Sequence, residues 1–135
     1  MNVKIQVARG VERGTMAYLR NEKEIVEMDY PINQVWVAIA EAISSLEWKT
    51  EEKNELEYQV KAKTKSNFMA YPSELTINAI IVGENMTRVT VSAETPVTTI
   101  TGIVDFGKTR ERIDSFLLAL VKQLKSENTN SEDKE

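Results

Sequence analysis

The pattern of apolar and polar residues predicts a helix in the first half of the chain. From residue 32 to residue 46, apolar side chains recur every three or four positions, which is the spacing of one face of an amphipathic helix. These residues are Ile32, Val35, Trp36, Ile39, Ile43 and Leu46. Pro31 precedes them, and proline suits the first turn of a helix, where its missing N–H would be unpaired anyway. We therefore predict a core-facing helix that opens at Pro31.

A second helical pattern lies near the end of the chain. It begins at about Asp105 or Gly107 and ends at Lys125. Its apolar stripe consists of Ile113, Phe116, Leu117, Leu120, Val121 and Leu124. Asp105 is a suitable N-cap, because its carboxylate can accept hydrogen bonds from unpaired backbone N–H groups. Residues 126–135 are polar, small and charged, so we expect a disordered acidic tail.

Between the two helices the residues alternate with a period of two, which is typical of antiparallel strands with one buried and one wet face. Turn-forming residues divide this region at 53–55 and 83–85. The apolar face of the four predicted strands comprises Trp48 and Thr50; Leu56, Tyr58, Val60, Ala62 and Thr64; Leu75, Ile77, Ala79 and Ile81; and Val89, Val91 and Ala93. Four successive strands joined by short turns predict a meander.

The N-terminal residues carry a weaker strand pattern. Val3, Ile5 and Val7 alternate with polar neighbours, which predicts a short strand. A firmer strand ends near Asp29, and residues 16–19 can form a further short strand. Residues 8–15, which precede residues 16–19, read as a turn or loop.

Together these patterns predict an α+β fold. Its order is β-α-β-β-β-β-α, with an N-terminal β extension. Each helix has one apolar stripe and the sheet has one apolar face, so both helices should lie on one face of a curved antiparallel sheet. We assign residues 1–22 to the N-terminal extension, 23–125 to a single domain and 126–135 to the tail.

This arrangement resembles the TATA-binding-protein-like and helix-grip folds. Residues 31–124 also resemble a family of small uncharacterised microbial domains. The shared features are the proline-opened helix with Val35-Trp36, and Asp105-Phe106-Gly107-Lys108 at the start of the last helix, where relatives often carry tryptophan at position 106. The resemblance covers about two thirds of the chain. It implies a fold but no established function.

Composition excludes several kinds of chemistry. The 135 residues include no cysteine and no histidine, which removes thiolate chemistry and the commonest zinc ligands. The carboxylates show no recognisable catalytic or metal-binding spacing. We therefore expect a non-catalytic protein without a cofactor or metal. The formal net charge of −4 argues against a nucleic-acid partner, because binding phosphates needs a basic surface.

The sequence also lacks the signals of a membrane or exported protein. The longest apolar runs, 35–40 and 116–121, are far shorter than the about 20 residues that span a bilayer. The first ten residues lack the apolar region of a signal peptide. We expect no membrane partner and a cytoplasmic location.

Residues 102–109, GIVDFGKT, match the phosphate-loop pattern G-x-x-x-x-G-K-[ST]. In such loops, backbone N–H groups and the lysine converge on phosphates at a helix N-terminus. Asp105 would place a carboxylate where the phosphate charge should lie. The preceding strands are also predicted to be antiparallel, whereas phosphate loops occur on parallel sheets. Nucleotide binding through Gly102, Gly107, Lys108 and Thr109 is therefore the alternative hypothesis.

The leading candidate site lies in two apolar connections. Residues 66–72 join two strands, and residues 95–104 join the last strand to the last helix. Alternate connections of a meander lie at the same end of the sheet, so we expect these two to meet near Leu46 and Trp48. Their apolar side chains either seal the core or form a binding mouth. The candidate residues are Trp48, Phe68, Met69, Tyr71, Val97, Ile100, Ile103 and Phe106.

These observations favour a non-catalytic binding or interaction module. Its expected partner is an apolar small molecule, another protein or a second copy of this chain, held at the end of the sheet that carries the two apolar connections. The pattern of inward-facing residues is compatible with two alternatives: an end of the sheet that is sealed by the core, or an open binding mouth.

Overall fold

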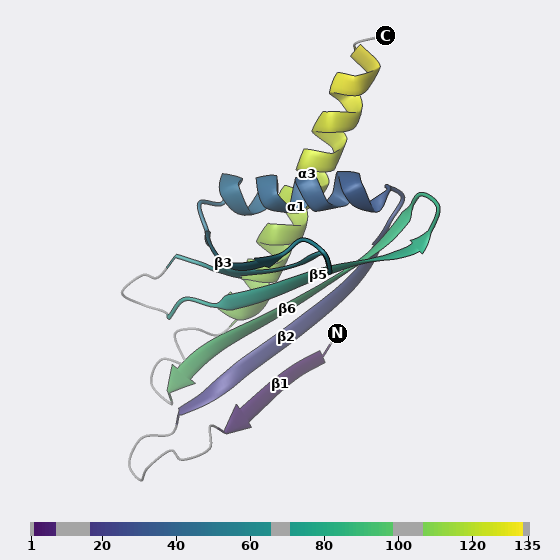
Figure 1. Cartoon of the computed structure of the whole chain (residues 1–135). Coiled ribbons are helices and arrows are strands. Elements are labelled where there is room, and N and C mark those ends of the chain that lie inside the picture. The colour runs from purple at the N-terminus through teal and green to yellow at the C-terminus, as the bar shows by residue number, and fades with distance from the viewer. Residues whose placement is uncertain (1, 8–16, 66–70, 99–106, 134–135) are drawn as a thin grey trace.

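The structure is a computed structural model. It describes the backbone of residues 2–7, 17–65, 71–98 and 107–133 and the side chains of residues 19–65, 71–96 and 107–126. The described strands form one six-stranded sheet in which every neighbouring pair is antiparallel (Figure 1). From one edge to the other, the order is β1 (Asn2–Val7), β2 (Ala17–Met28), β6 (Met86–Thr98), β5 (Glu74–Gly83), β4 (Gln59–Lys63) and β3 (Lys49–Asn54).

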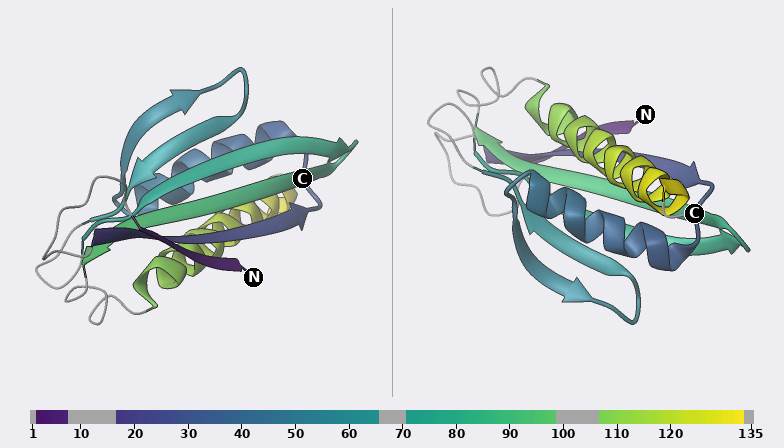
Figure 2. Two further views of the ribbon diagram at one scale, coloured as in Figure 1. Left: turned by 90° about the horizontal axis from the view of Figure 1, so that it is seen from below. Right: turned by 90° about the horizontal axis from the view of Figure 1, so that it is seen from above.

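Two helices cover one face of this sheet. α1 (Ile32–Ser45) and α3 (Lys108–Asp133) lie side by side on it, as Figure 2 shows from above. α1 packs on β5, β3 and β6, whereas α3 packs on β6 and β2 and also contacts α1. The predicted α+β class, the β3–β6 meander and the placement of both helices on one face are therefore confirmed.

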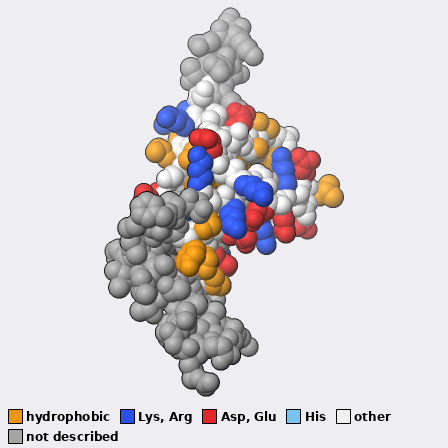
Figure 3. All heavy atoms as spheres, turned by 90° about the vertical axis from the view of Figure 1, so that its left-hand side faces the viewer, with side chains coloured by type: hydrophobic (Ala, Val, Ile, Leu, Met, Phe, Trp, Pro, Cys, Tyr) orange, Lys and Arg blue, Asp and Glu red, His pale blue; other side chains and the backbone are white. Residues whose placement is uncertain are grey.

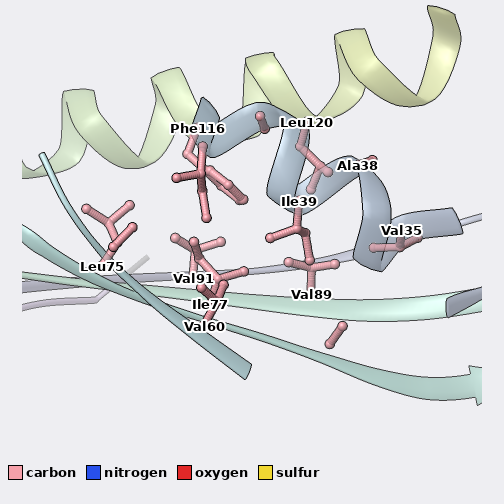
Figure 4. Packing of buried hydrophobic residues seen from close by; sticks show 14 of the residues in the cluster. Val35, Ala38, Ile39, Val60, Leu75, Ile77, Val89, Val91, Phe116 and Leu120 are labelled. Carbon is pink, nitrogen blue, oxygen red and sulfur yellow. The ribbon is translucent and has the colours of Figure 1, made fainter. Parts of the chain in front are cut away.

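The core fills the space between the helices and the sheet. Alternation along the strands directs Ile77 and Val91, which are paired across β5 and β6, toward the helices. Phe116 of α3 and Ile39 of α1 meet them from the other side (Figure 4). All four side chains are at most 1% exposed. The periodicity in the sequence thus predicted the centre of the core correctly.

Four predicted inward positions are exposed, and one of them is Thr50 on β3, a strand that is exposed throughout. Leu56 is 94% exposed, because the Asn54 side chain accepts hydrogen bonds from the backbone N–H groups of residues 56 and 57 and holds them in a turn. Ile81 is 61% exposed, since it lies at the end of the β5–β6 hairpin, which extends past the helices in Figure 1. Val121 of α3 is also exposed.

Two predicted boundaries also need correction. The two strands expected before Asp29 are one strand, β2, which pairs with β6 from Ala17↔Thr98 to Met28↔Thr87. It runs without interruption from Ala17 to Met28. α3 continues past Lys125 to Asp133, so the structure assigns residues 126–133 to a helix where the sequence predicted a disordered tail.

Candidate functional site

The register of the sheet determines which segments meet at the end where β5 begins. Lys49 pairs with Lys63 and Lys63 with Glu74, which in turn pairs with Glu94. The start of β3, the end of β4, the start of β5 and the last part of β6 therefore lie at one end of the sheet, which we call the loop end. Trp48 directly precedes β3 and Tyr71 precedes β5, so the fold brings both to this end.

The predicted site residues are only partly described. Trp48 is half-buried and packs against the core, whereas Tyr71 is 46% exposed. Val97 belongs to β6 at the loop end. The predicted residues Phe68, Met69, Ile100, Ile103 and Phe106 lie outside the described residues. Of the two predicted site residues whose side chains are described, Trp48 and Tyr71, Tyr71 is the one exposed enough to contact a ligand.

Next to Tyr71 the surface is hollowed, with a volume of about 410 Å³. Its lining comes from β2, β4, β6 and the start of β5: Leu19, Lys63, Tyr71, Pro72, Glu74, Glu94 and Pro96. Leu75 and Ala93 are buried under the helices, so their neighbours Glu74 and Glu94 lie on the opposite face. We call this site the loop-end hollow, and it opens on the face of the sheet that carries no helix.

The loop-end hollow has an apolar side and a charged side. Leu19 pairs with Pro96 across β2 and β6, and Tyr71 and Pro72 continue this apolar wall. One row further along the strands, Glu94, Glu74 and Lys63 stand opposite one another. Figure 3 faces this end of the molecule and shows apolar side chains close to acidic and basic ones.

Glu74 is electrostatically perturbed. Burial raises the pKa of its carboxyl above the ordinary value, and a side-chain hydrogen bond with Glu51 raises it further. The positive charge of Lys61 opposes this shift, whereas the negative charges of Glu51 and Glu94 add to it. Burial and the neighbouring carboxylates therefore outweigh the attraction of Lys61 at Glu74.

On the helix-covered face of the same end, buried hydroxyl groups form a chain. Ser73, Thr95 and Thr109 are all fully buried. The Oγ atoms of Ser73 and Thr95 are 2.5 Å apart, and the hydroxyl oxygens of Thr95 and Thr109 are 2.8 Å apart. Arg112 donates from Nη1 to the Ser73 hydroxyl and to the carbonyl oxygen of Tyr71. This hydroxyl chain fastens the start of α3 to β6 and to the start of β5.

The seam between β2 and α3 is charged. Arg110 donates to Glu24 and also pairs with Asp114 at 3.0 Å. Glu22 is 6% exposed, and burial raises the pKa of its carboxyl although the nearby guanidinium of Arg110 opposes the shift. Within the described residues, one shielded oxygen of Glu22 and the shielded Nη1 of Arg110 have no hydrogen-bond partner.

The phosphate-loop match has a different structural role in its described part. Gly107 has a φ of +80°, which glycine adopts without strain before the helix begins. Lys108 pairs with Glu111 at 3.7 Å, and the Thr109 hydroxyl belongs to the hydroxyl chain. Gly102 lies outside the described residues. A buried Thr109 and an antiparallel sheet both argue against a magnesium-bound phosphate at this position.

Sequence reasoning missed most of the lining of the loop-end hollow. Alternation placed Glu74 and Glu94 on the outward face, but only the register of β5 against β6 brings them opposite each other. No sequence pattern indicated that the prolines at positions 72 and 96 would line a site.

In the part of the chain that the structure describes, no group of acidic side chains is suited to hold a metal ion. No helix in this part has the length and apolarity needed to cross a membrane.

A long C-terminal helix held against a curved antiparallel sheet, with a shorter helix beside it, defines the helix-grip class of folds. Solved structures of this kind are similar to the chain, although no family model and no curated protein matches it. Norcoclaurine synthase from Thalictrum flavum, in complex with dopamine and hydroxybenzaldehyde, has a TM-score of 0.60 and 11% identity over 93% of this chain and 98% of that chain.

Two further structures have the same arrangement. The Zhui aromatase/cyclase from Streptomyces sp. R1128 has a TM-score of 0.58 and 10% identity over 79% of this chain and 94% of its own. A START superfamily protein from Mycobacterium smegmatis has a TM-score of 0.60 and 10% identity over 78% and 97%. At such identities the likeness shows the fold alone. Of the two folds that the sequence resembles, the helix-grip fold is the one these structures support.

Proposed function

We propose that this protein is a non-catalytic module that binds a small, largely apolar molecule at the loop end. The observation that carries this proposal is the loop-end hollow, whose apolar wall is built around the exposed Tyr71. A ligand that covers this wall removes aromatic and proline surface from water, which is favourable at about 25 cal/mol per Å². Val97 lies on β6 at this end, and Phe68, Met69, Ile100, Ile103 and Phe106 stay predicted members of the proposed site.

The fold gives this proposal further support. The norcoclaurine synthase structure contains two small aromatic molecules, and the other similar structures include an aromatase/cyclase. Those two proteins are enzymes. Here the described part of the hollow offers carboxylates and a lysine but no constellation of a nucleophile with a base, so we propose binding without catalysis.

The test uses a neutral apolar fluorophore, N-phenyl-1-naphthylamine, whose emission rises in an apolar site. We expect saturable binding to the full chain. The Tyr71→Ser change should weaken this binding by about tenfold, because an aromatic anchor at the centre of a site carries much of the binding energy. Since Tyr71 is exposed, the free energy of unfolding should change by less than about 0.5 kcal/mol.

The matched control is Leu56→Ser. This change also removes an exposed apolar side chain, but from the turn at the opposite end of the sheet, so fluorophore binding should not change. Equal affinities of the two variants, or no saturable binding to the unmodified chain, would contradict the proposal. Cooperative loss of the fold in Tyr71→Ser would also contradict it, by showing that the loop end is part of the core.

Two alternatives predict different results in native mass spectrometry. A dimer that dissociates in Tyr71→Ser would assign the loop end to a second copy or another protein rather than to a small molecule. Magnesium-dependent ATP or GTP binding that Lys108→Ala destroys would favour the nucleotide hypothesis, which the buried hydroxyl of Thr109 opposes. Membership of the small microbial family, suggested by residues 105–108, and the cytoplasmic location stay predictions.

A further inference from the structure

We propose that the ligand of the loop-end hollow is an organic ammonium ion. Its apolar body would lie against Tyr71 and the prolines, and its cationic head between Glu74 and Glu94. This inference rests on the proposed function and names the chemical class of its ligand. It depends on the hydrogen-bond acceptors along the charged side of the hollow and on the aromatic ring of Tyr71, which lines the same hollow.

The two carboxylates are held together by the sheet. Glu74 and Glu94 are directly opposite each other in the antiparallel ladder, where side chains start about 5 Å apart and like charges destabilise the pair. Among the described residues, the side-chain ion pairs involve neither carboxylate, although Lys61 attracts Glu74 and Glu51 shares a hydrogen bond with it. A cation bound between them would therefore relieve repulsion as well as gain attraction.

A third acceptor extends the same row. Asn21 stands opposite Glu94 on β2, and its side-chain oxygen is shielded from solvent with no hydrogen-bond donor among the described residues. The unpaired carbonyl dipole adds to the negative potential at Glu94. In this one row, the outward side chains of β2, β6 and β5 are an amide and two carboxylates, with no positive charge among them.

Tyr71 supplies a complementary surface. Its ring is exposed at the edge of this row, and aromatic faces attract cations with about 0.5–1 kcal/mol at exposed sites. Lys63 lies on the other side of Glu74, toward β3. An ammonium head therefore fits best on the side of Glu74 that faces Glu94, away from the lysine, with Tyr71 in the lining of the same hollow. A carboxylate ligand would instead face two acidic side chains and one lysine.

The test compares three molecules of similar shape that differ in charge: benzylamine, benzyl alcohol and phenylacetate. Titration calorimetry at neutral pH should show that benzylamine binds about tenfold more tightly than benzyl alcohol, and phenylacetate more weakly than both. In the double variant Glu74→Gln with Glu94→Gln, the preference for benzylamine should disappear, whereas the affinity for benzyl alcohol should stay within about twofold.

The control is the double variant Glu41→Gln with Glu84→Gln. It changes the net charge by the same amount at exposed positions on α1 and in the β5–β6 turn, so the preference for benzylamine should remain. A preference that survives in Glu74→Gln with Glu94→Gln, or benzyl alcohol binding as tightly as benzylamine, would overturn the ammonium inference.

The results also separate this inference from the proposed function. If the amine and the alcohol bind equally and Tyr71→Ser weakens both, the hollow is a binding site but not one for cations. If none of the three molecules binds, and N-phenyl-1-naphthylamine does not bind either, the proposed function itself fails and the ammonium inference fails with it.

Discussion

Two polar regions lie on opposite faces of the sheet at the loop end. They are built from residues that are adjacent in the sequence. Ser73 and Thr95 face the helices and belong to the hydroxyl chain, whereas Glu74 and Glu94 face outward and line the hollow. Strand alternation alone separates the two pairs. Inside, each hydroxyl has a protein partner at hydrogen-bond distance. Outside, two like charges stand opposite each other, with Lys63 beyond Glu74 and Lys61 acting on Glu74 from nearby.

The difference indicates which region is structural and which is open to a ligand. A buried polar group without a partner costs about 1–3 kcal/mol, so buried polar groups are expected to be paired with one another. Arg112 and the three hydroxyl groups of the chain meet this expectation. An exposed charged pair has no such requirement, because water solvates it. Surface carboxylates that form no ion pair with their neighbours in the row can therefore persist until a ligand supplies the donor.

The largest effect is expected in the apolar part of the helix-covered face. Phe116→Ala should lower the free energy of unfolding by about 3–5 kcal/mol, because it leaves a cavity between α3 and the sheet. Urea denaturation would measure this cost. Leu118→Ala, at a position of the same helix that is 69% exposed, should change stability by less than about 0.5 kcal/mol. A small cost at Phe116 would indicate that this face has spare space for a ligand.

An intermediate effect is expected in the hydroxyl chain. Thr95→Val keeps the shape of the side chain but leaves the hydroxyls of Ser73 and Thr109 without their shared partner. It should destabilise the fold by about 1–3 kcal/mol without altering the affinity for N-phenyl-1-naphthylamine. Thr76→Val on the outward face is the control and should cost less than about 0.5 kcal/mol. A loss of dye affinity in the stably folded Thr95 variant would move the ligand site to the helix-covered face.

The smallest effect is expected at the charged seam, and it depends on pH. The folded-state pKa of Glu22 is raised above its ordinary value of 4.5, and Arg110, Asp114 and Arg20 are the charged groups that act on it. The folded protein therefore holds this proton more tightly than the unfolded chain does. Stability should fall as the pH rises from the unfolded pKa through the raised folded pKa.

Glu22→Gln tests this dependence. At neutral pH it should stabilise the protein by an amount on the order of 1 kcal/mol, and the gain should shrink in acid. Thermal unfolding at several pH values, with the exposed Glu41→Gln as the reference, would show the trend. A destabilised Glu22→Gln at neutral pH would mean that attraction to Arg110 and Arg20 outweighs the cost of burial.

The periodicity of the sequence predicted those elements whose inward side chains are apolar. α1, β5, β6 and the buried stripe of α3 all belong to this group. β2 was predicted only in pieces, because its inward positions near the loop end are Arg20, Glu22 and Glu24 rather than apolar residues. Arg110, the partner of Glu24, lies on a helix far along the chain, so no local pattern predicts this contact.

The sequence predicted which segments of the chain meet at the loop end, but it did not predict the lining of the hollow there. Meander topology correctly brought the neighbourhoods of Trp48 and Tyr71 to one end of the sheet. The pairing of Glu74 with Glu94 and of Leu19 with Pro96 depends on the register between strands. A one-residue shift in register would exchange the two faces. Register is fixed by packing across the whole sheet, which a single sequence does not reveal.

The long pairing of β2 with β6 has a consequence for the route by which the chain folds. β3, β4, β5 and β6 follow one another as neighbours, so each of their pairings closes a short loop. β2 instead joins residues as distant as Ala17 and Thr98, and long closures carry a larger entropic cost and slow folding. The meander can therefore assemble before β2 docks. Since Leu19 comes from β2, the loop-end hollow would be among the last features of the molecule to form.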